Sequence, residues 1–137
     1  MKSRDALIRL KRFEVEEKRR KVAEIEVMIG DFNHMATDLD RQIAIEQERA
    51  GVSDVNHYSY PTFAKAAIQR RNNLTASAVN LETKLANARE QLDEALEELK
   101  KIELLEERDA ERARLEQSRN PQGELEPVTA GAHRVAS

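Results

Sequence analysis

The chain has 137 residues, of which 36% are charged and only 4% are aromatic, with no tryptophan and no cysteine. This composition is too poor in bulky side chains for a spherical core, but it suits long helices that pack along a narrow apolar stripe. The net charge of −3 gives no overall basic field for nucleic-acid binding, and the lack of cysteine excludes disulfides and fits a reducing cytoplasm. No secretory signal and no membrane-spanning run is apparent, so we expect a cytoplasmic chain without direct membrane insertion.

Residues 3–50 are predicted to form a first helix, with Ser3 as its N-cap. Apolar residues recur seven apart, with a second set between them, which is the heptad pattern of a coiled coil. The members of this first seam are Ile8, Val15, Val22, Ile25, Ile29, Phe32, Ala36, Leu39, Ile43 and Ala50. Lys11 and Lys18 weaken the pattern near its start, and Gly30 in mid-helix costs ~1 kcal/mol relative to alanine.

Residues 51–60 interrupt the heptads and are predicted to form a turn. Gly51 is suited to end the first helix because glycine readily adopts the backbone conformation found just after a helix. Asp54 and Asn56 favour turns through side-chain bonds to the backbone. Pro61 is then predicted to open the second helix, because proline is tolerated in a first turn.

Residues 61–118 are predicted to form a second helix with an apolar seam spaced alternately by three and four residues. The members of this second seam are Ala64, Ala67, Leu74, Ala78, Leu81, Leu85, Ala88, Leu92, Ala95, Leu99 and Ile102, with Arg71 as the one charged interruption. From Asn120 onward the periodicity ends, and residues 119–137 are predicted to be a disordered tail.

The charge pattern favours an antiparallel pairing of the two helices. Residues 1–21 contain nine basic and four acidic residues, whereas residues 82–107 contain nine acidic and four basic ones. Folding the chain about the turn places these stretches side by side, whereas a parallel homodimer would align like charges. We therefore predict an all-α fold in which residues 3–118 form a long two-helix antiparallel coiled-coil hairpin. The last turns, about residues 108–118, are expected to extend past the first helix without a partner.

Residues with catalytic or metal-binding potential are scattered. The sequence has no phosphate-binding loop and no dinucleotide-binding glycine motif. The histidines His34, His57 and His133 are isolated, and none has a second ligand at metal-binding spacing. The basic runs at residues 11–12 and 18–21 are interleaved with acids and lack aromatics, which is typical of a solvated face. We expect no enzyme activity, no metal and no cofactor.

Several apolar residues lie off the seams and are candidates for partner binding. Near the terminal end of the hairpin these are Ala6, Leu10, Phe13, Leu104 and Leu115. Nearer the turn, Ile45 and Ile68 are also off the seam, although single exposed apolar residues are normal on any surface. The aromatics Tyr58, Tyr60 and Phe63 suggest a second contact point, with the alternative that Phe63 closes the end of the seam. An unpartnered apolar stripe on a helix is a common docking face for other proteins.

Two segments resemble the flagellar export protein FliJ family. The first is the N-terminal stretch ALIRLKRFEVEEKRR at residues 6–20. The second is YPTF at residues 60–63, which precedes an alanine-rich helix start and RRNNL at residues 70–74. The resemblance covers about residues 3–118. The chain departs from the family by lacking aromatics near residues 42–49.

The resemblance implies a cytoplasmic component of the flagellar type III export apparatus, associated with the cytoplasmic face of the membrane only through its partners. Its partners would be the export ATPase hexamer, whose assembly and activity it promotes, the export gate membrane protein, and export chaperones. On that view Ala6, Leu10, Phe13, Leu104 and Leu115 would face the ATPase, and Ile45, Tyr60, Phe63, Ala67 and Ile68 would face the gate.

Two other functions remain open from the sequence. One is a generic cytoplasmic coiled-coil scaffold or tether that self-associates, which would form a stable homodimer or filament. The other is a nucleic-acid-binding arm, whose binding would fall steeply with salt. The charge pattern disfavours the last, so no nucleic-acid partner is expected.

Overall fold

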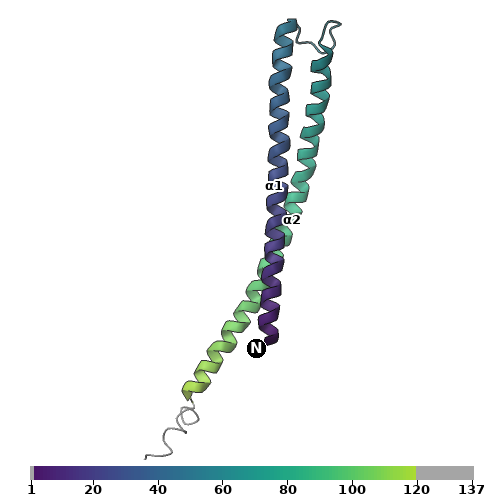
Figure 1. Ribbon diagram of the computed structural model, residues 1–137. Helices are drawn as coiled ribbons and strands as arrows, with labels where there is room; N and C mark the ends of the chain where they lie inside the picture. Colours follow the sequence, from purple (N-terminus) through teal and green to yellow (C-terminus); the bar gives the residue numbers. More distant parts are fainter. Residues whose placement is uncertain (1, 120–137) are drawn as a thin grey trace, which may run out of the picture. The chain divides into compact units, whose positions relative to one another are not determined.

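Residues 2–119 are described by a computed structural model, in which they form two long helices and no strand. Helix α1 spans Lys2–Ala50 and helix α2 spans Thr62–Arg119 (Figure 1). The predicted all-α fold of two long helices joined by a turn is confirmed. Helix α1 starts one residue before the predicted position, at Lys2. The predicted tail, 119–137, lies outside the described residues apart from Arg119, which ends α2.

The chain divides into two units, each containing a piece of both helices. The turn unit comprises residues 13–95, and the terminal unit comprises residues 1–12 together with those from 96 onward, described to residue 119. In the turn unit, Glu26 and Asp40 of α1 form ion pairs with Arg89 and Arg71 of α2, respectively. The later residue of α1 therefore pairs with the earlier residue of α2, so the helix segments run antiparallel.

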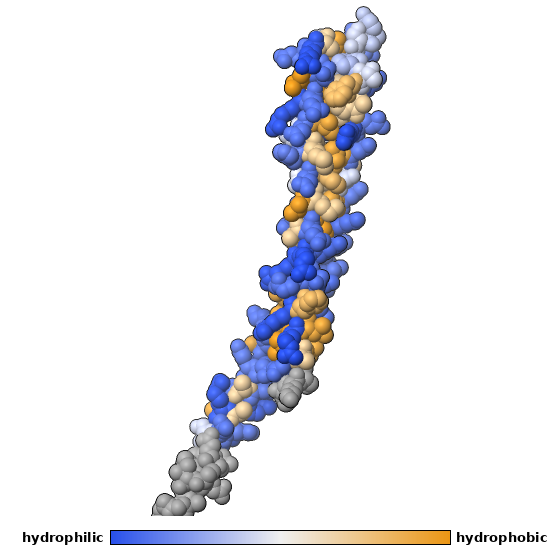
Figure 2. All heavy atoms as spheres, in the orientation of Figure 1, coloured by the Kyte–Doolittle hydropathy of each residue, from blue (hydrophilic) through white to orange (hydrophobic). Residues whose placement is uncertain are grey.

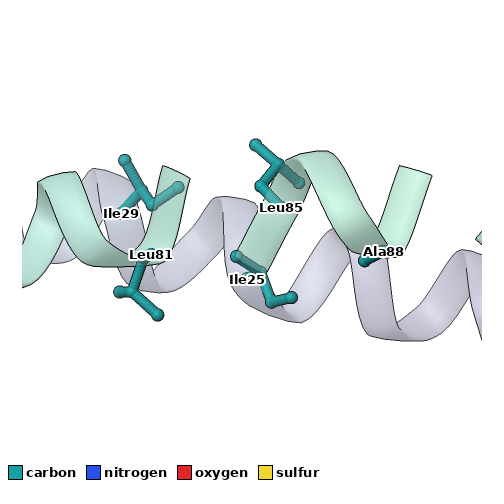
Figure 3. Close-up of a cluster of buried hydrophobic side chains, with 5 residues drawn as sticks. All are labelled: Ile25, Ile29, Leu81, Leu85 and Ala88. Carbon is teal, nitrogen blue, oxygen red and sulfur yellow. The ribbon is translucent and has the colours of Figure 1, made fainter. Parts of the chain in front are cut away.

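The core of the turn unit is the seam predicted from the heptads. Its buried apolar residues from α1 are Val15, Ile25, Ile29, Ala36 and Ile43, and those from α2 are Ala64, Ala67, Ala78, Leu81, Leu85, Ala88 and Ala95. Figure 3 shows Ile25 and Ile29 lying against Leu81, Leu85 and Ala88 of the facing helix. Because alanines alternate with larger residues on α2, the helices pack along a narrow stripe. Ala50, which was also predicted to be in the seam, is exposed because α1 ends there.

The terminal unit has a smaller apolar interface. Ile8 of α1 is buried, and Leu99 and Ile102 of α2 are half-buried. Every residue from 110 to 119 is exposed, so the end of α2 has no helix packed against it within the described part of this unit. This exposed end starts two residues later than expected from the sequence, because Asp109 is still half-buried and pairs with Arg4.

The connection between the helices is fixed by backbone hydrogen bonds. The N–H of Gly51 donates to the carbonyl of Glu48 at 3.3 Å, and the N–H of Val52 donates to that of Gln47 at 3.3 Å. These two bonds make a Schellman motif, which requires a left-handed residue, and Gly51 has φ of 68°. Pro61 lies just before α2, and its carbonyl accepts the first helical bond from Lys65 at 3.1 Å. Proline therefore caps the second helix instead of opening it as predicted.

Two glycine-to-alanine changes are expected to have opposite effects on stability. Gly51→Ala should lower the free energy of unfolding by about 1–2 kcal/mol, because alanine is strained in the left-handed conformation. Gly30→Ala should raise it by about 1 kcal/mol, because a Cβ at this helical position meets no atom within 4 Å. Urea denaturation of both variants checks the prediction, and effects of the same sign would contradict it.

Candidate partner-binding surfaces

In the terminal unit, the predicted partner-binding residues are all exposed. Ala6 and Leu10 lie on the surface of α1, and Leu104 and Leu115 lie on the surface of α2. Leu10, Leu104 and Leu115 are each close to half exposed, with fractions of 51%, 48% and 52%. About half of the surface of each leucine is therefore accessible to another protein.

Phe13 belongs to the turn unit and is the most exposed of its phenylalanines. Its exposed fraction is 60%, whereas that of Phe63 is 54% and Phe32 is half-buried. Phe13 lies off the seam, as its helical position predicted. More than half of this large aromatic side chain is therefore accessible to another protein.

Residues at the turn divide into exposed and buried aromatics. Tyr58 is 93% exposed, and its ring stacks on that of His57 with the centroids 4.6 Å apart. Tyr60 is only 8% exposed, and its hydroxyl accepts a hydrogen bond of 2.7 Å from the side-chain amide of Gln47. Tyr60 is therefore the buried aromatic at the turn, whereas Phe63, the residue considered for closing the end of the seam, is exposed. The prediction that Tyr60 lies on a docking surface is wrong.

The remaining residues predicted to face the gate protein also differ in exposure. Ile45 is 50% exposed and Ile68 is half-buried, so both present apolar surface. Ala67 is 5% exposed because it is a seam residue of α2. Ala67 therefore does not lie on an exposed docking surface, and its assignment to one is corrected, because its side chain packs in the seam between the helices. Ile45, Phe63 and Ile68 are the members of this set with side chains that a partner could reach.

Ion pairs join the two helices of the terminal unit, as the opposite charges of the two stretches predict. Arg4 hydrogen-bonds to Asp109 and lies 3.5 Å from a carboxylate oxygen of Glu106. Lys11 pairs with Glu98 at 2.9 Å, and Arg12 pairs with Glu103 at 3.0 Å. Each exposed pair contributes only ~0.2–1 kcal/mol, so the charges select the antiparallel orientation while the seam supplies most of the stability.

Two of these pairs shift the pKa of a carboxyl group. The hydrogen bond from Arg4, with added charge attraction, lowers the pKa of Asp109 against the opposing effect of desolvation. The hydrogen bond and charge of Lys11 lower the pKa of Glu98 in the same way. Both carboxylates are therefore more readily ionised in the folded than in the unfolded chain.

These shifts predict a loss of stability in acid. A folded-state pKa below the unfolded value of about 4 means that each carboxylate stabilises the fold above that pH. This stabilisation should be lost as the pH falls through the lowered folded-state pKa. We expect the melting temperature of the Asp109→Asn/Glu98→Gln variant to lie below that of the wild type at pH 7 and to approach it at pH 2. A difference in melting temperature between the variant and the wild type that stays constant from pH 7 to pH 2 would contradict the prediction.

The turn unit has further exposed apolar residues that the sequence analysis did not single out. They are Val27, Met28, Met35, Val55 and Val79, and the terminal unit adds Leu7 and Leu105. Figure 2 shows apolar residues interrupting the polar surface on the face in view. Leu7, Met28 and Met35 each directly precede a residue of the first seam, and this adjacency is the sequence signal that could have identified them.

Two shallow hollows that are lined by residues of both helices lie along the turn unit beside these methionines. The first is lined by Ile25, Met28, Leu81, Ala88 and the longer polar residues Lys21, Lys84, Asn87 and Gln91. The second is lined by Met35, Asp38, Leu39, Gln42, Arg70 and Leu74. Their volumes of 250 and 220 Å³ are smaller than the 300–1,000 Å³ typical of small-molecule pockets. Side chains of another protein are better matched to them in size.

Within residues 2–119, the two histidines do not form a metal-binding cluster. His34 is exposed with Nε2 at 3.9 Å from Asp38, and the His57 Nδ1 accepts a bond of 3.0 Å from the Ser59 N–H. His133 lies outside the described residues. Over residues 2–119, no three His, Asp or Glu side chains are placed to hold a metal ion.

Within the same range, neither helix is apolar enough to cross a membrane. The chain matches no protein-family model, no curated protein and no solved structure.

Proposed function

We propose that this chain is a component of a flagellar type III protein export apparatus. In this role it binds the export ATPase hexamer, promotes its assembly and activity, and couples it to the export gate membrane protein and export chaperones. The chain would be cytoplasmic and would reach the membrane surface only through these partners. It would act by binding and would catalyse no reaction itself.

The observation that carries the proposal is the set of exposed leucines in the terminal unit. Leu10 on α1 and Leu104 and Leu115 on α2 each present about half of an apolar side chain to solvent. Exposed apolar residues of this size in a helical protein favour a partner groove. The resemblance of residues 6–20 to the export family supports the ATPase as that partner.

For the gate protein, the proposal is restricted to the accessible residues. Ile45 and Phe63 are at least half exposed, and Ile68 is partly so. These three remain candidates, whereas Tyr60 and Ala67 are too buried to take part without opening the hairpin. The export chaperones have no assigned residues.

The test is reconstitution with a purified flagellar export ATPase. Wild-type chain should increase both the fraction of ATPase hexamers and the rate of ATP hydrolysis. The Leu10→Ala/Leu104→Ala variant should lose this stimulation while keeping the helical circular dichroism signal. Val79→Ala, which truncates a residue that is 62% exposed in the turn unit, is the matched control and should stimulate normally.

Sedimentation separates this function from that of a self-associating scaffold. The export component should sediment as a monomer at micromolar concentration in the absence of the ATPase. A stable homodimer or filament, together with no effect on the ATPase, would contradict the proposal and favour the scaffold.

A further inference from the structure

The two sides of the turn unit differ in how the seam is covered. Successive seam residues are alternately three and four positions apart. In an antiparallel coiled coil, the residues that open the four-residue gaps face each other on one side of the seam, and those that close these gaps face each other on the other. On the first side, Glu26 and Arg89 form an ion pair at 2.9 Å across the seam. Asp40 on the same side receives Arg71 at 2.9 Å. These long, oppositely charged side chains cover this edge of the apolar seam.

The other side has no ion pair across the seam within residues 13–95 and contains the two hollows, with one hydrogen bond of 3.3 Å from Lys18 to Gln91, which lines the first. Met28 and Met35 precede the seam residues Ile29 and Ala36, and they are 43% and 40% exposed. Beside them the hollows reach seam residues of both helices, including Ile25 and Leu81 in the first and Leu39 and Leu74 in the second. We call this strip, lined by the residues of both hollows, the methionine groove.

The apolar surface of the methionine groove is suited to a helix. Met28 and Met35 are one heptad apart, which is about 10.5 Å along α1. An amphipathic helix presents apolar side chains with the same repeat, so successive turns can enter the two hollows. Methionine is flexible and polarisable, and it adapts its shape to an incoming apolar side chain.

The charges along the methionine groove indicate the chemistry of that helix. Lys21 and Lys84 line the first hollow and Arg70 lines the second, and all three are exposed. None of them forms an ion pair with another residue in the range 2–119. The one acid that lines the hollows, Asp38, is already paired with Arg41 at 2.9 Å. The groove therefore combines an apolar floor with available cations.

We propose that the methionine groove of the turn unit binds the apolar face of an acidic amphipathic helix from another protein. The helix contributes apolar side chains to the hollows beside Met28 and Met35. Its flanking carboxylates pair with Lys21, Lys84 and Arg70. This site is separate from the leucines of the terminal unit and does not depend on the function proposed above.

The test uses the full chain and two labelled peptides of 21 residues, designed with leucines at heptad spacing. One peptide has glutamates flanking the leucines, and the other has lysines in the same places. Fluorescence anisotropy should show binding of the acidic peptide, weakening as salt is raised, because the attraction is screened. The basic peptide should bind at least tenfold more weakly. Equal binding of both peptides, or binding of neither, would overturn the proposal.

Variants locate the binding site. Met28→Glu/Met35→Glu should weaken binding of the acidic peptide more than tenfold, and Lys21→Glu/Lys84→Glu should weaken it about tenfold. Val79→Glu changes a residue that is more exposed than either methionine but lies outside both hollows, and it should bind as the wild type does. Circular dichroism confirms that each variant is folded. An equal loss of peptide binding with Val79→Glu would overturn the assignment of the binding site to the methionine groove. A wild-type homodimer that Met28→Glu/Met35→Glu dissociates would also overturn it, because a second copy of the chain would then occupy the groove.

Discussion

Replacing Leu85 by alanine is expected to lower the free energy of unfolding by about 2–3 kcal/mol. Leu85 is 5% exposed and lies in the apolar cluster with Ile25, Ile29 and Leu81 (Figure 3). Truncation removes its contacts across the seam and leaves a space that the two helices fill only in part. The expected loss of unfolding free energy lies at the lower end of the range for leucine-to-alanine changes at buried positions, because two helices adjust to the lost volume more easily than a core enclosed on all sides.

Urea denaturation followed by circular dichroism measures this effect. Leu104→Ala is the matched control, because it removes the same atoms from a side chain that is 48% exposed. We expect its effect on the free energy of unfolding to be within about 0.5 kcal/mol. Equal losses for the two variants would show that Leu85 is not in the interface between the helices.

Enlarging Ala64 to leucine is expected to lower the free energy of unfolding by about 1–3 kcal/mol. Ala64 has no exposed surface and is the most buried residue of the apolar core. Added methylene groups at this fully buried position are expected to push the helices apart or to force a strained rotamer.

Ala66→Leu provides the control for this substitution, because Ala66 is exposed two residues along the same helix. This variant should keep the wild-type stability, since leucine and alanine are both good helix formers. Thermal melting of the two variants gives the comparison. A higher melting temperature for Ala64→Leu than for the wild type would mean that the start of α2 is not closely packed on α1.

Every buried apolar residue within α1 and α2 belongs to a predicted seam, because a heptad repeat specifies which face of a helix is apolar, although seam residues such as Val22, Leu39 and Leu92 are only half-buried. This rule applied to Leu81, Leu85 and Ala88, which lie deep within a long helix. It failed for Ala50, because the Schellman motif ends α1 at this residue and leaves no further turn to pack. Periodicity locates the interior of a helix but not the local hydrogen bonds that end it.

The turn shows why the aromatics were assigned less accurately. Tyr60 and Phe63 lie on either side of the start of α2, so helical angles do not apply to both. Tyr60 is buried, and its hydroxyl accepts a hydrogen bond from the side-chain amide of Gln47. That contact depends on the path of the loop, which single-residue preferences do not determine.

Exposed apolar residues were predicted best where they are far from the seam. Leu10 and Phe13 have helical angles well away from it and are exposed as expected. Met28 and Met35 are next to it, and their exposure depends on which side chains face them from α2. The heptad repeat does not indicate which proteins the chain binds, because the same repeat occurs in scaffolds, tethers and export components.

Thiol cross-linking tests the antiparallel intrachain pairing most directly, because the chain has no cysteine of its own. Cysteines would replace Lys11 and Glu98 in one variant, and Glu26 and Arg89 in another, each treated with a short bis-maleimide. Both variants should give a cross-linked product of monomer mass, while Lys11→Cys alone should remain uncross-linked. Cross-linking of Lys11→Cys to a second copy, with no product of monomer mass from the paired variants, would contradict the hairpin.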